Sequence, residues 1–224
     1  MNETLRPVSI VDAVCDAIRE RILTGQLGPA EVLYEQATAE LYGVARPTAK
    51  AAIDRLVHAG LLRRTANKSA HVPQLTEADV HDLYFSRLAI ETMVVSHLAA
   101  EGLVPDKAQA ALRDFDAAAK AGSVQGIIDS DIAFHQALVE SVGSPRVLRM
   151  YSSIIGEAHL CMVLKQTHHL QAPKAIAREH RAIYDAILGG NSEVAQTKLA
   201  QHLQKSERAI RSHIRDTDER RVHE

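Results

Sequence analysis

The 224-residue sequence predicts a mainly α-helical protein with two domains, a winged helix-turn-helix over residues 1–73 and an all-helical bundle over residues 74–224. Aromatic residues make up only 4% of the chain and Trp is absent, whereas Ala, Leu, Ile and Val are plentiful. This composition favours packed helices over a β-sandwich. Apolar residues also recur at three- and four-residue spacing, and Gly and Pro interrupt the pattern at helix-length intervals.

The first predicted helix covers residues 9–25. Ser9 is a suitable N-cap, an apolar stripe follows it, and Gly25 ends the pattern. A Gly-Pro turn at residues 28–29 and a short apolar run at residues 32–33 lead into the next helix.

Two further helices, Tyr34 to Leu41 and a second within the segment 43–62, are separated by Gly43. The second has an apolar face formed by Ala49, Ala52, Ile53, Leu56 and Val57, and an opposite face that carries Arg46, Lys50, Arg55 and His58. Two short helices joined by a Gly-containing turn are typical of a helix-turn-helix. The alternative is an ordinary solvated helix face in a bundle.

The segment that follows predicts a β-hairpin, the wing of the domain. Residues 63–73 form two short extended runs around the polar tip Asn67-Lys68-Ser69. From Arg46 to Lys68 the chain has six Lys or Arg residues and one acid, Asp54. Such local positive charge suits phosphate binding, because neutralised phosphates release counterions.

The charge balance differs between the two predicted domains. Residues 42–72 carry a net charge of +5, whereas residues 76–224 carry −3. A basic patch on a mildly acidic protein favours a regulated nucleic-acid binder over a packaging protein. Cys15 and Cys161 lack CxxC spacing, and no signal pattern or membrane-spanning run is present, so a cytoplasmic protein with free thiols and no membrane partner is expected.

The second domain is predicted to be helical throughout. Thr76 is a suitable N-cap, with Asp79 three residues later as in a capping box. The charged end of the chain is expected to be frayed. The predicted helices span residues 76–101, 105–121, 124–141, 145–165, 173–189 and 191–217.

Four polar residues fall on the apolar stripes of these helices. Asp131 and His135 are four residues apart and share one face of helix 124–141, His180 lies in the stripe of helix 173–189, and His202 lies in that of helix 191–217. Buried polar groups without partners are costly. A shared divalent cation would satisfy all four, and one carboxylate with three imidazoles suits Zn, Ni, Fe, Mn or Co.

Three alternatives stay open at this point. Each histidine can be an ordinary hydrogen-bonded core residue. His168-His169 is a rival metal pair, although it lies in a predicted loop. The metal could also serve a hydrolase, but no second carboxylate lies on these stripes as a general base, since Glu179 points about 100° away from His180 around the helix.

Residues 8–73 resemble the winged helix-turn-helix of the GntR family of bacterial transcription regulators. The motifs are Gly25-x-Leu27-x-Pro29, Leu33-x-Glu35, Gly43-Val44-x-Arg46, Arg55-Leu56 and Gly60-Leu61-Leu62. The resemblance implies that Arg46 contacts DNA, with Lys50 as a substituted base and Thr48 as a looser match. The basic residues of the predicted wing, Arg63, Arg64 and Lys68, complete the predicted DNA-binding set.

Nearly the whole of residues 76–217 resembles the FadR-like branch of this family, whose effector domain is the all-helical FCD domain. The motifs are Asp131-x-x-Phe134-His135, Glu179-His180 with Ile183, and His202-Leu203. The resemblance implies that the Asp-His-His-His set binds a divalent metal whose open positions take a small carboxylic acid. Arg87 matches a family arginine, so it is a candidate carboxylate clamp or a partner of Glu91 four residues on.

Together these patterns predict a homodimeric repressor that binds a palindromic double-stranded operator and responds to a small organic acid. The alternatives are a metal-dependent hydrolase and a regulator whose metal is purely structural.

Overall fold

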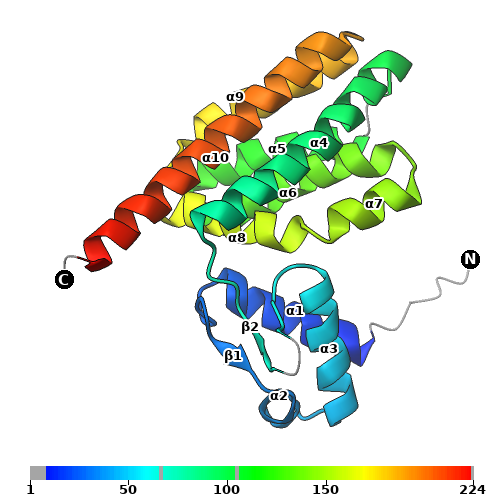
Figure 1. Ribbon diagram of the computed structural model, residues 1–224. Coiled ribbons are helices and arrows are strands. Elements are labelled where there is room, and N and C mark those ends of the chain that lie inside the picture. Colours follow the sequence, from blue (N-terminus) through cyan, green and yellow to red (C-terminus); the bar gives the residue numbers. More distant parts are fainter. Residues whose placement is uncertain (1–8, 66–67, 104–105, 223–224) are drawn as a thin grey trace, which may run out of the picture. The chain divides into compact units, whose positions relative to one another are not determined.

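The computed structural model describes residues 9–65, 68–103 and 106–222. Within these ranges the chain is almost entirely α-helical, with one two-stranded antiparallel sheet (Figure 1). It divides into two compact units, residues 1–74 and 75–224. Among the described residues no single helix is long and apolar enough to cross a membrane; two pairs of consecutive helices meet the length and composition test only when taken together across a bend.

The first unit contains three helices. They are α1 (Ile10–Leu23), α2 (Glu35–Tyr42) and α3 (Arg46–His58). Ser9 caps α1, because its hydroxyl accepts a hydrogen bond from the backbone N–H of Val11 at 3.2 Å. Gly43 ends α2 with a φ of 63°, a left-handed conformation that Gly adopts without steric cost, and so allows the turn into α3.

The strands of the first unit pair differently from a simple hairpin. Strand β2 (Ala70–His71) pairs with β1 (Val32–Leu33), and Arg63 forms an antiparallel bridge with His71. The extended segment at Arg63 therefore lies beside His71, as the predicted wing requires. Strand β1, the short apolar run before α2, adds a third extended segment on β2. The predicted tip residue Asn67 lies outside the described residues.

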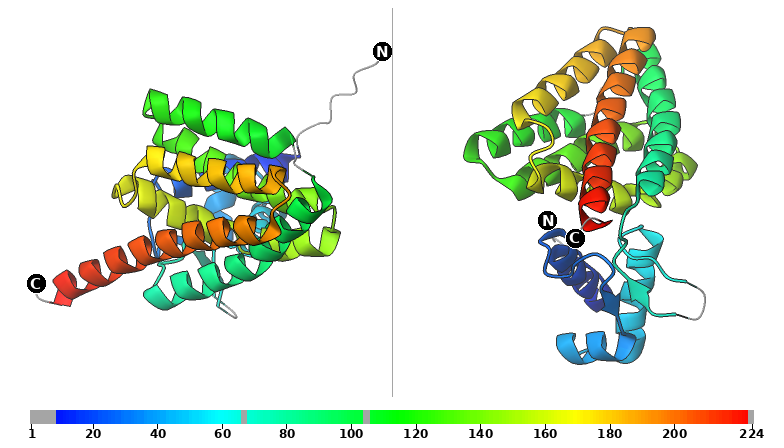
Figure 2. Two further views of the ribbon diagram at one scale, coloured as in Figure 1. Left: turned by 90° about the horizontal axis from the view of Figure 1, so that it is seen from above. Right: turned by 60° about the vertical axis from the view of Figure 1, so that its left-hand side comes forward.

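The second unit contains seven described helices. They are α4 (Glu77–Glu101), α5 (Asp106–Ala121), α6 (Val124–Ser141), α7 (Pro145–Ser152), α8 (Ile155–Thr167), α9 (Pro173–Leu188) and α10 (Ser192–Val222). Thr76 and Asp79 form the predicted capping box at the start of α4. In the views of Figure 2, α10 lies alongside α4, and it also packs against α9.

Two predicted helix boundaries are wrong. The single helix expected over residues 145–165 breaks after Ser152, and α7 and α8 meet at an angle of 48°. The hydroxyls of Ser152 and Ser153 donate to the carbonyl oxygens of Leu148 and Met150, both at 2.7 Å, and such bonds compete with continued helix. The predicted helix end at residue 217 is also wrong, because α10 continues to Val222.

Candidate metal centre and nucleic-acid interface

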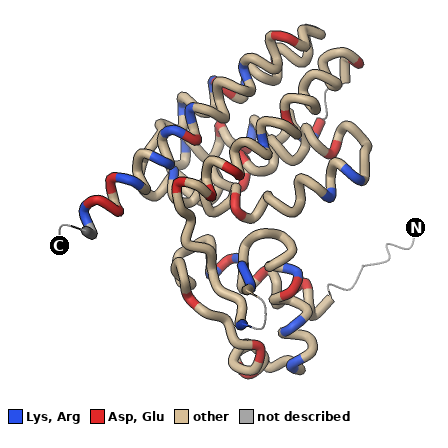
Figure 3. The backbone as a smooth tube through the Cα atoms, viewed as in Figure 1, with Lys and Arg blue, Asp and Glu red and all other residues tan. Residues whose placement is uncertain are grey.

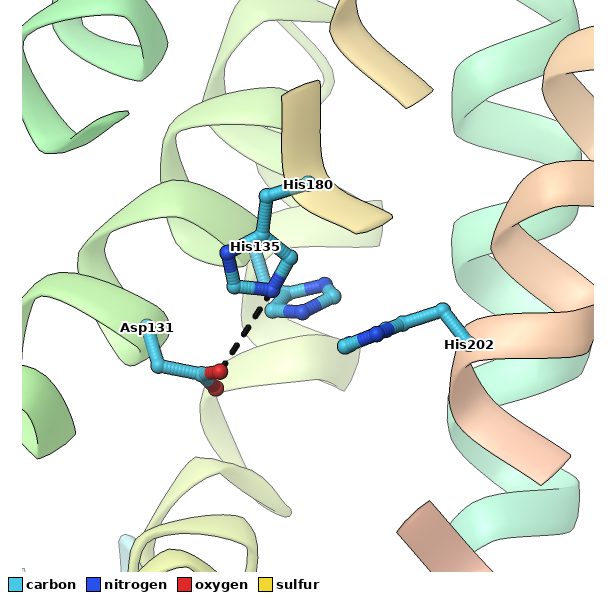
Figure 4. A group of neighbouring side chains, drawn as sticks. All are labelled: Asp131, His135, His180 and His202. Atoms are coloured by element: carbon cyan, nitrogen blue, oxygen red, sulfur yellow. Dashed lines mark ion pairs between the residues drawn. The ribbon is translucent and has the colours of Figure 1, made fainter. Parts of the chain in front are cut away.

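The four residues of the predicted metal set lie together in the second unit. Asp131 and His135 come from α6, His180 from α9 and His202 from α10, and their side chains converge (Figure 4). One ligand atom from each residue lies within 4.8 Å of the others. All four residues are buried, with His202 the most exposed at 3%. The helical stripes thus placed the four side chains in one interior region.

The three imidazoles surround a common point rather than stacking in a row. The ring centroids of His135 and His180 are 5.1 Å apart, those of His135 and His202 5.3 Å, and those of His180 and His202 4.7 Å. Asp131 Oδ1 lies 3.4 Å from His180 Nε2. These separations leave the ligand atoms close enough to reach one ion after small adjustments.

Unpartnered polar atoms concentrate at this point. His135 Nε2, both ring nitrogens of His180 and Asp131 Oδ1 are buried and accept or donate no hydrogen bond among the described residues. Leaving such an atom unsatisfied costs about 1–3 kcal/mol. A divalent cation would take up His135 Nε2, Asp131 Oδ1 and one of the two His180 nitrogens, and a set of three nitrogens and one oxygen suits Zn or a similar transition metal. The residues therefore fit a metal ion.

Two carboxylates orient two of the three histidines through hydrogen bonds to Nδ1. Glu91 Oε2 lies 2.5 Å from His135 Nδ1, and Glu179 Oε2 lies 2.8 Å from His202 Nδ1. Each bond places the proton on Nδ1 and leaves Nε2 available to a metal, the usual arrangement around metal-binding histidines. The sequence pattern indicates neither role, because it places Glu91 only as a partner of Arg87 and Glu179 only as a possible base.

Arg87 forms the predicted ion pair with Glu91, and its role as a carboxylate clamp stays a prediction. Its Nε donates to Glu91 Oε1 at 2.8 Å, so the ion pair within α4 is present, and the Tyr151 hydroxyl also donates to Glu91 Oε1 at 3.2 Å. Arg87 is only 2% exposed, yet its Nη2 is buried without a partner. The N–H groups of this nitrogen therefore have no acceptor among the described residues.

The charges of the site are set by burial and by neighbouring groups. Burial alone would raise the pKa of Glu91, but Arg87 and His135 lower it to about 2. Burial would likewise raise the pKa of Asp131, and the positive charge of Lys165 is foremost among those that instead hold it well below its usual range. Burial lowers the pKa of His202 to about 4 and that of His180 well below its usual range. Above about pH 5 both of these imidazoles are therefore neutral and can bind metal.

Acidification is expected to destabilise the metal-free protein between about pH 6.5 and pH 4. In this range the unfolded chain protonates His202 whereas the folded chain does not, because the folded pKa is lowered from 6.5 to about 4. Stability is therefore fully present above pH 6.5, and His202 alone accounts for a loss of about 3 kcal/mol by pH 4. Urea unfolding in chelator at stepped pH measures this loss. A His202→Gln variant should show a shallower pH dependence, and an equal slope would contradict the burial of a neutral His202.

Removing the Glu179 carboxylate is expected to weaken metal binding about 10- to 100-fold, the usual cost of losing an outer-shell partner. Glu179→Ala loses the acceptor for His202 Nδ1, whereas Glu179→Gln keeps an acceptor without the charge and should fall between Ala and the unchanged protein. Competition with a chromogenic chelator measures the affinity. The exposed carboxylate of Glu193 provides the control variant Glu193→Ala. Equal affinities for Glu179→Ala and the control would contradict the orienting role.

The rival pair, His168 and His169, belongs to no cluster of three or more metal-ligating side chains among the described residues. His168 and His169 follow α8, and the ring of His168 packs against His213 with centroids 4.1 Å apart.

The predicted DNA-binding residues lie on the first unit, and Figure 3 shows Lys and Arg along α3. Arg46 and Lys50 are exposed on the N-terminal half of α3, with Arg46 Nε 3.2 Å from Glu35 Oε2. Thr48 is half-buried beside them. Of the wing residues, Lys68 is exposed, whereas Arg63 and Arg64 are half-buried and Arg64 forms an ion pair with Asp54.

Comparison with known proteins gives two family matches. Residues 10–72 match the bacterial regulatory proteins of the gntR family, and residues 82–205 match the FCD domain. The HTH-type transcriptional regulator YdhC of Bacillus subtilis is 26% identical, over 83% of this chain and 84% of its own.

Solved structures agree with these matches. A transcriptional regulator GntR from Rhodococcus sp. RHA1 has 26% identity and a TM-score of 0.75, covering 89% of this chain and 96% of that chain. The Zn²⁺-bound FCD domain of another transcriptional regulator shares the fold of the second unit, with 20% identity and a TM-score of 0.51 over 62% of this chain and 95% of that one.

Proposed function

The chain belongs to the GntR family of bacterial transcription regulators and carries an FCD domain, and from this premise we propose that it is a homodimeric repressor released from DNA by a small carboxylic acid. The family and the relatives are regulators rather than enzymes, so the metal-dependent hydrolase alternative is rejected. The observation that carries the proposal is the buried Asp131, His135, His180 and His202 cluster with its unpartnered ligand atoms.

The four clustered residues would hold the divalent ion, Zn, Ni or similar. A bound ion of this kind supplies coordination positions for a carboxylate oxygen. Glu91 and Glu179 fix the orientation of two imidazoles, and the free Nη2 of Arg87 offers a hydrogen bond to the same anion. The Zn²⁺-bound form of a related FCD domain supports this use of the fold.

DNA binding is assigned to the exposed basic residues of the first unit. Arg46 and Lys50 on α3 would reach base edges in the major groove, and two copies in a dimer would read the two halves of a palindromic operator. Thr48, Arg63, Arg64 and Lys68 would contact the phosphate backbone and so set position rather than sequence.

Gel-shift titration of the metal-loaded protein with a panel of small organic acids tests the proposal. An acid that binds better to the DNA-free arrangement must lower operator affinity by the same factor, which is typically about 5- to 150-fold. Unchanged operator affinity with every acid in the panel would reject effector control.

A purely structural ion is distinguished by a second measurement. Chelation would then lower thermal stability, while calorimetry of the metal-loaded protein would detect no binding of any acid. Acid binding that disappears with the ion supports the sensing role instead.

A further inference from the structure

Lys165 is buried next to the candidate metal centre with most of its hydrogen-bonding capacity unused. It lies on α8 and is 1% exposed. Its Nζ donates to Ser206 Oγ on α10 at 3.2 Å, and it forms no ion pair within 4.0 Å among the described residues. An ammonium group carries three donor hydrogens, so two of them have no acceptor. A buried lysine left in this state is expensive unless another group approaches it.

Lys165 belongs to the same interior region as the metal ligands. Ser206, its hydrogen-bond partner, follows the metal ligand His202 by one turn of α10. Among the charged and imidazole neighbours that lower the pKa of Asp131, Lys165 has the largest effect, ahead of His180. Arg87 in turn is among the groups that lower the pKa of Lys165. Arg87 and Lys165 therefore approach one site from α4 and α8, two helices that supply none of the four metal ligands.

Without a divalent ion, the formal charges of the buried residues around the site sum to zero. Four buried residues of the described chain carry a formal charge, namely Arg87 and Lys165 against Glu91 and Asp131. The histidines are neutral as metal ligands. A divalent ion thus adds two positive charges to an interior that is already neutral. Glu179 does not offset them fully, because its second oxygen is engaged by Lys205. Uncompensated buried charge is unfavourable, so a bound ligand with two negative charges is strongly favoured.

We infer that the ligand of this site is a small organic acid with two carboxylates, one held beside the metal ligands and Arg87 and the other bound by Lys165. The inference rests on the proposed sensing function and specifies its ligand class. One dicarboxylate would accept hydrogen bonds from the two unused hydrogens of Lys165 and from the unpartnered Arg87 Nη2. It would also neutralise the excess positive charge of the metal-loaded site.

Isothermal titration calorimetry on the metal-loaded full-length protein tests the inference with acetate and propionate against malonate and succinate. The two dicarboxylates should bind at least about 10-fold more tightly, since a charge-assisted hydrogen bond is added. Lys165→Met keeps the length of the side chain without its charge. It should weaken dicarboxylate binding about 10- to 100-fold while changing monocarboxylate binding less than about 2-fold. Lys165→Arg retains the charge and should keep part of the preference.

Lys198→Met is the matched control, because Lys198 is an exposed lysine on α10. Metal content is measured for each variant. The ratio of dicarboxylate affinity to monocarboxylate affinity within one variant is unaffected by a general loss of binding. Equal affinities for the two acid classes, or an equal loss of both in Lys165→Met, would overturn the inference while leaving the sensing function in place. Absence of binding by any acid to the unchanged protein would overturn the sensing function itself.

Discussion

His180→Ala is expected to weaken metal binding by more than about 100-fold, because losing an outer-shell partner already costs about 10- to 100-fold and His180 supplies a ligand atom directly. His180 is fully buried, with its ring 5.1 Å from that of His135 and 4.7 Å from that of His202, and neither of its nitrogens has a hydrogen-bond partner among the described residues. An ion at 100 times its dissociation constant stabilises a protein by about 2.7 kcal/mol. For a unit of this size that corresponds to a rise in Tm of about 5–10 °C, which the variant should lose.

The measurement is the difference in Tm with and without metal, together with the metal content of the purified protein. This difference is unaffected by the cavity that the substitution itself creates in the core. His168→Ala is the control, since His168 packs against His213 away from the cluster. A variant that retains both its metal and its metal-dependent Tm shift would reject the four-residue site.

Arg46→Ala is expected to lower operator affinity by about 30-fold or more. Each bidentate contact with guanine is worth about 1–3 kcal/mol of discrimination, and a dimer loses two of them. Arg46→Lys should recover only part of the affinity, because an ammonium lacks the planar donor pair of a guanidinium. Fluorescence anisotropy on DNA selected from a random pool by the unchanged protein measures the effect, at fixed salt.

Two further variants separate reading of bases from simple charge. Arg149 is exposed on α7 of the second unit, so Arg149→Ala removes one positive charge without touching the first unit. Arg46 also pairs with Glu35, so Glu35→Ala combined with Arg46→Ala reveals whether Arg46 only neutralises that carboxylate. Full recovery of affinity in the double variant would contradict base contact by Arg46.

Most of the fold and the clustering of the four polar side chains could be predicted because they depend on local periodicity. Asp131 and His135 are four residues apart on one helix, and His180 and His202 replace apolar residues on two others, so a bundle that buries these stripes brings them together. The caps at Ser9 and Thr76 were equally readable, since their signals lie within three residues of each helix start.

The residues that hydrogen-bond to the clustered histidines depend on how the helices pack against one another, and the periodicity of the sequence does not determine this packing. Glu91 reaches His135 across 44 positions of sequence, and Glu179 reaches His202 across 23. Lys165 left one readable signal, because it lies four residues after the buried Cys161 on an apolar face of α8. The break between α7 and α8 could not be predicted, because residues 152–155 contain neither Gly nor Pro.

The unbroken length of α10 has a mechanical consequence. His202, Ser206, Ile210 and Ile214 form one buried stripe at four-residue spacing, and Glu207 contacts His81 near the start of α4 at 2.8 Å. With a rise of about 1.5 Å per residue, this stripe is a stiff rod about 18 Å long. We therefore expect a displacement of His202 on acid binding to move α10 as one piece and to reach the first turns of α4, where Glu207 contacts His81. Slower deuterium uptake by the backbone amides of residues 80–83 when an acid binds would support this coupling.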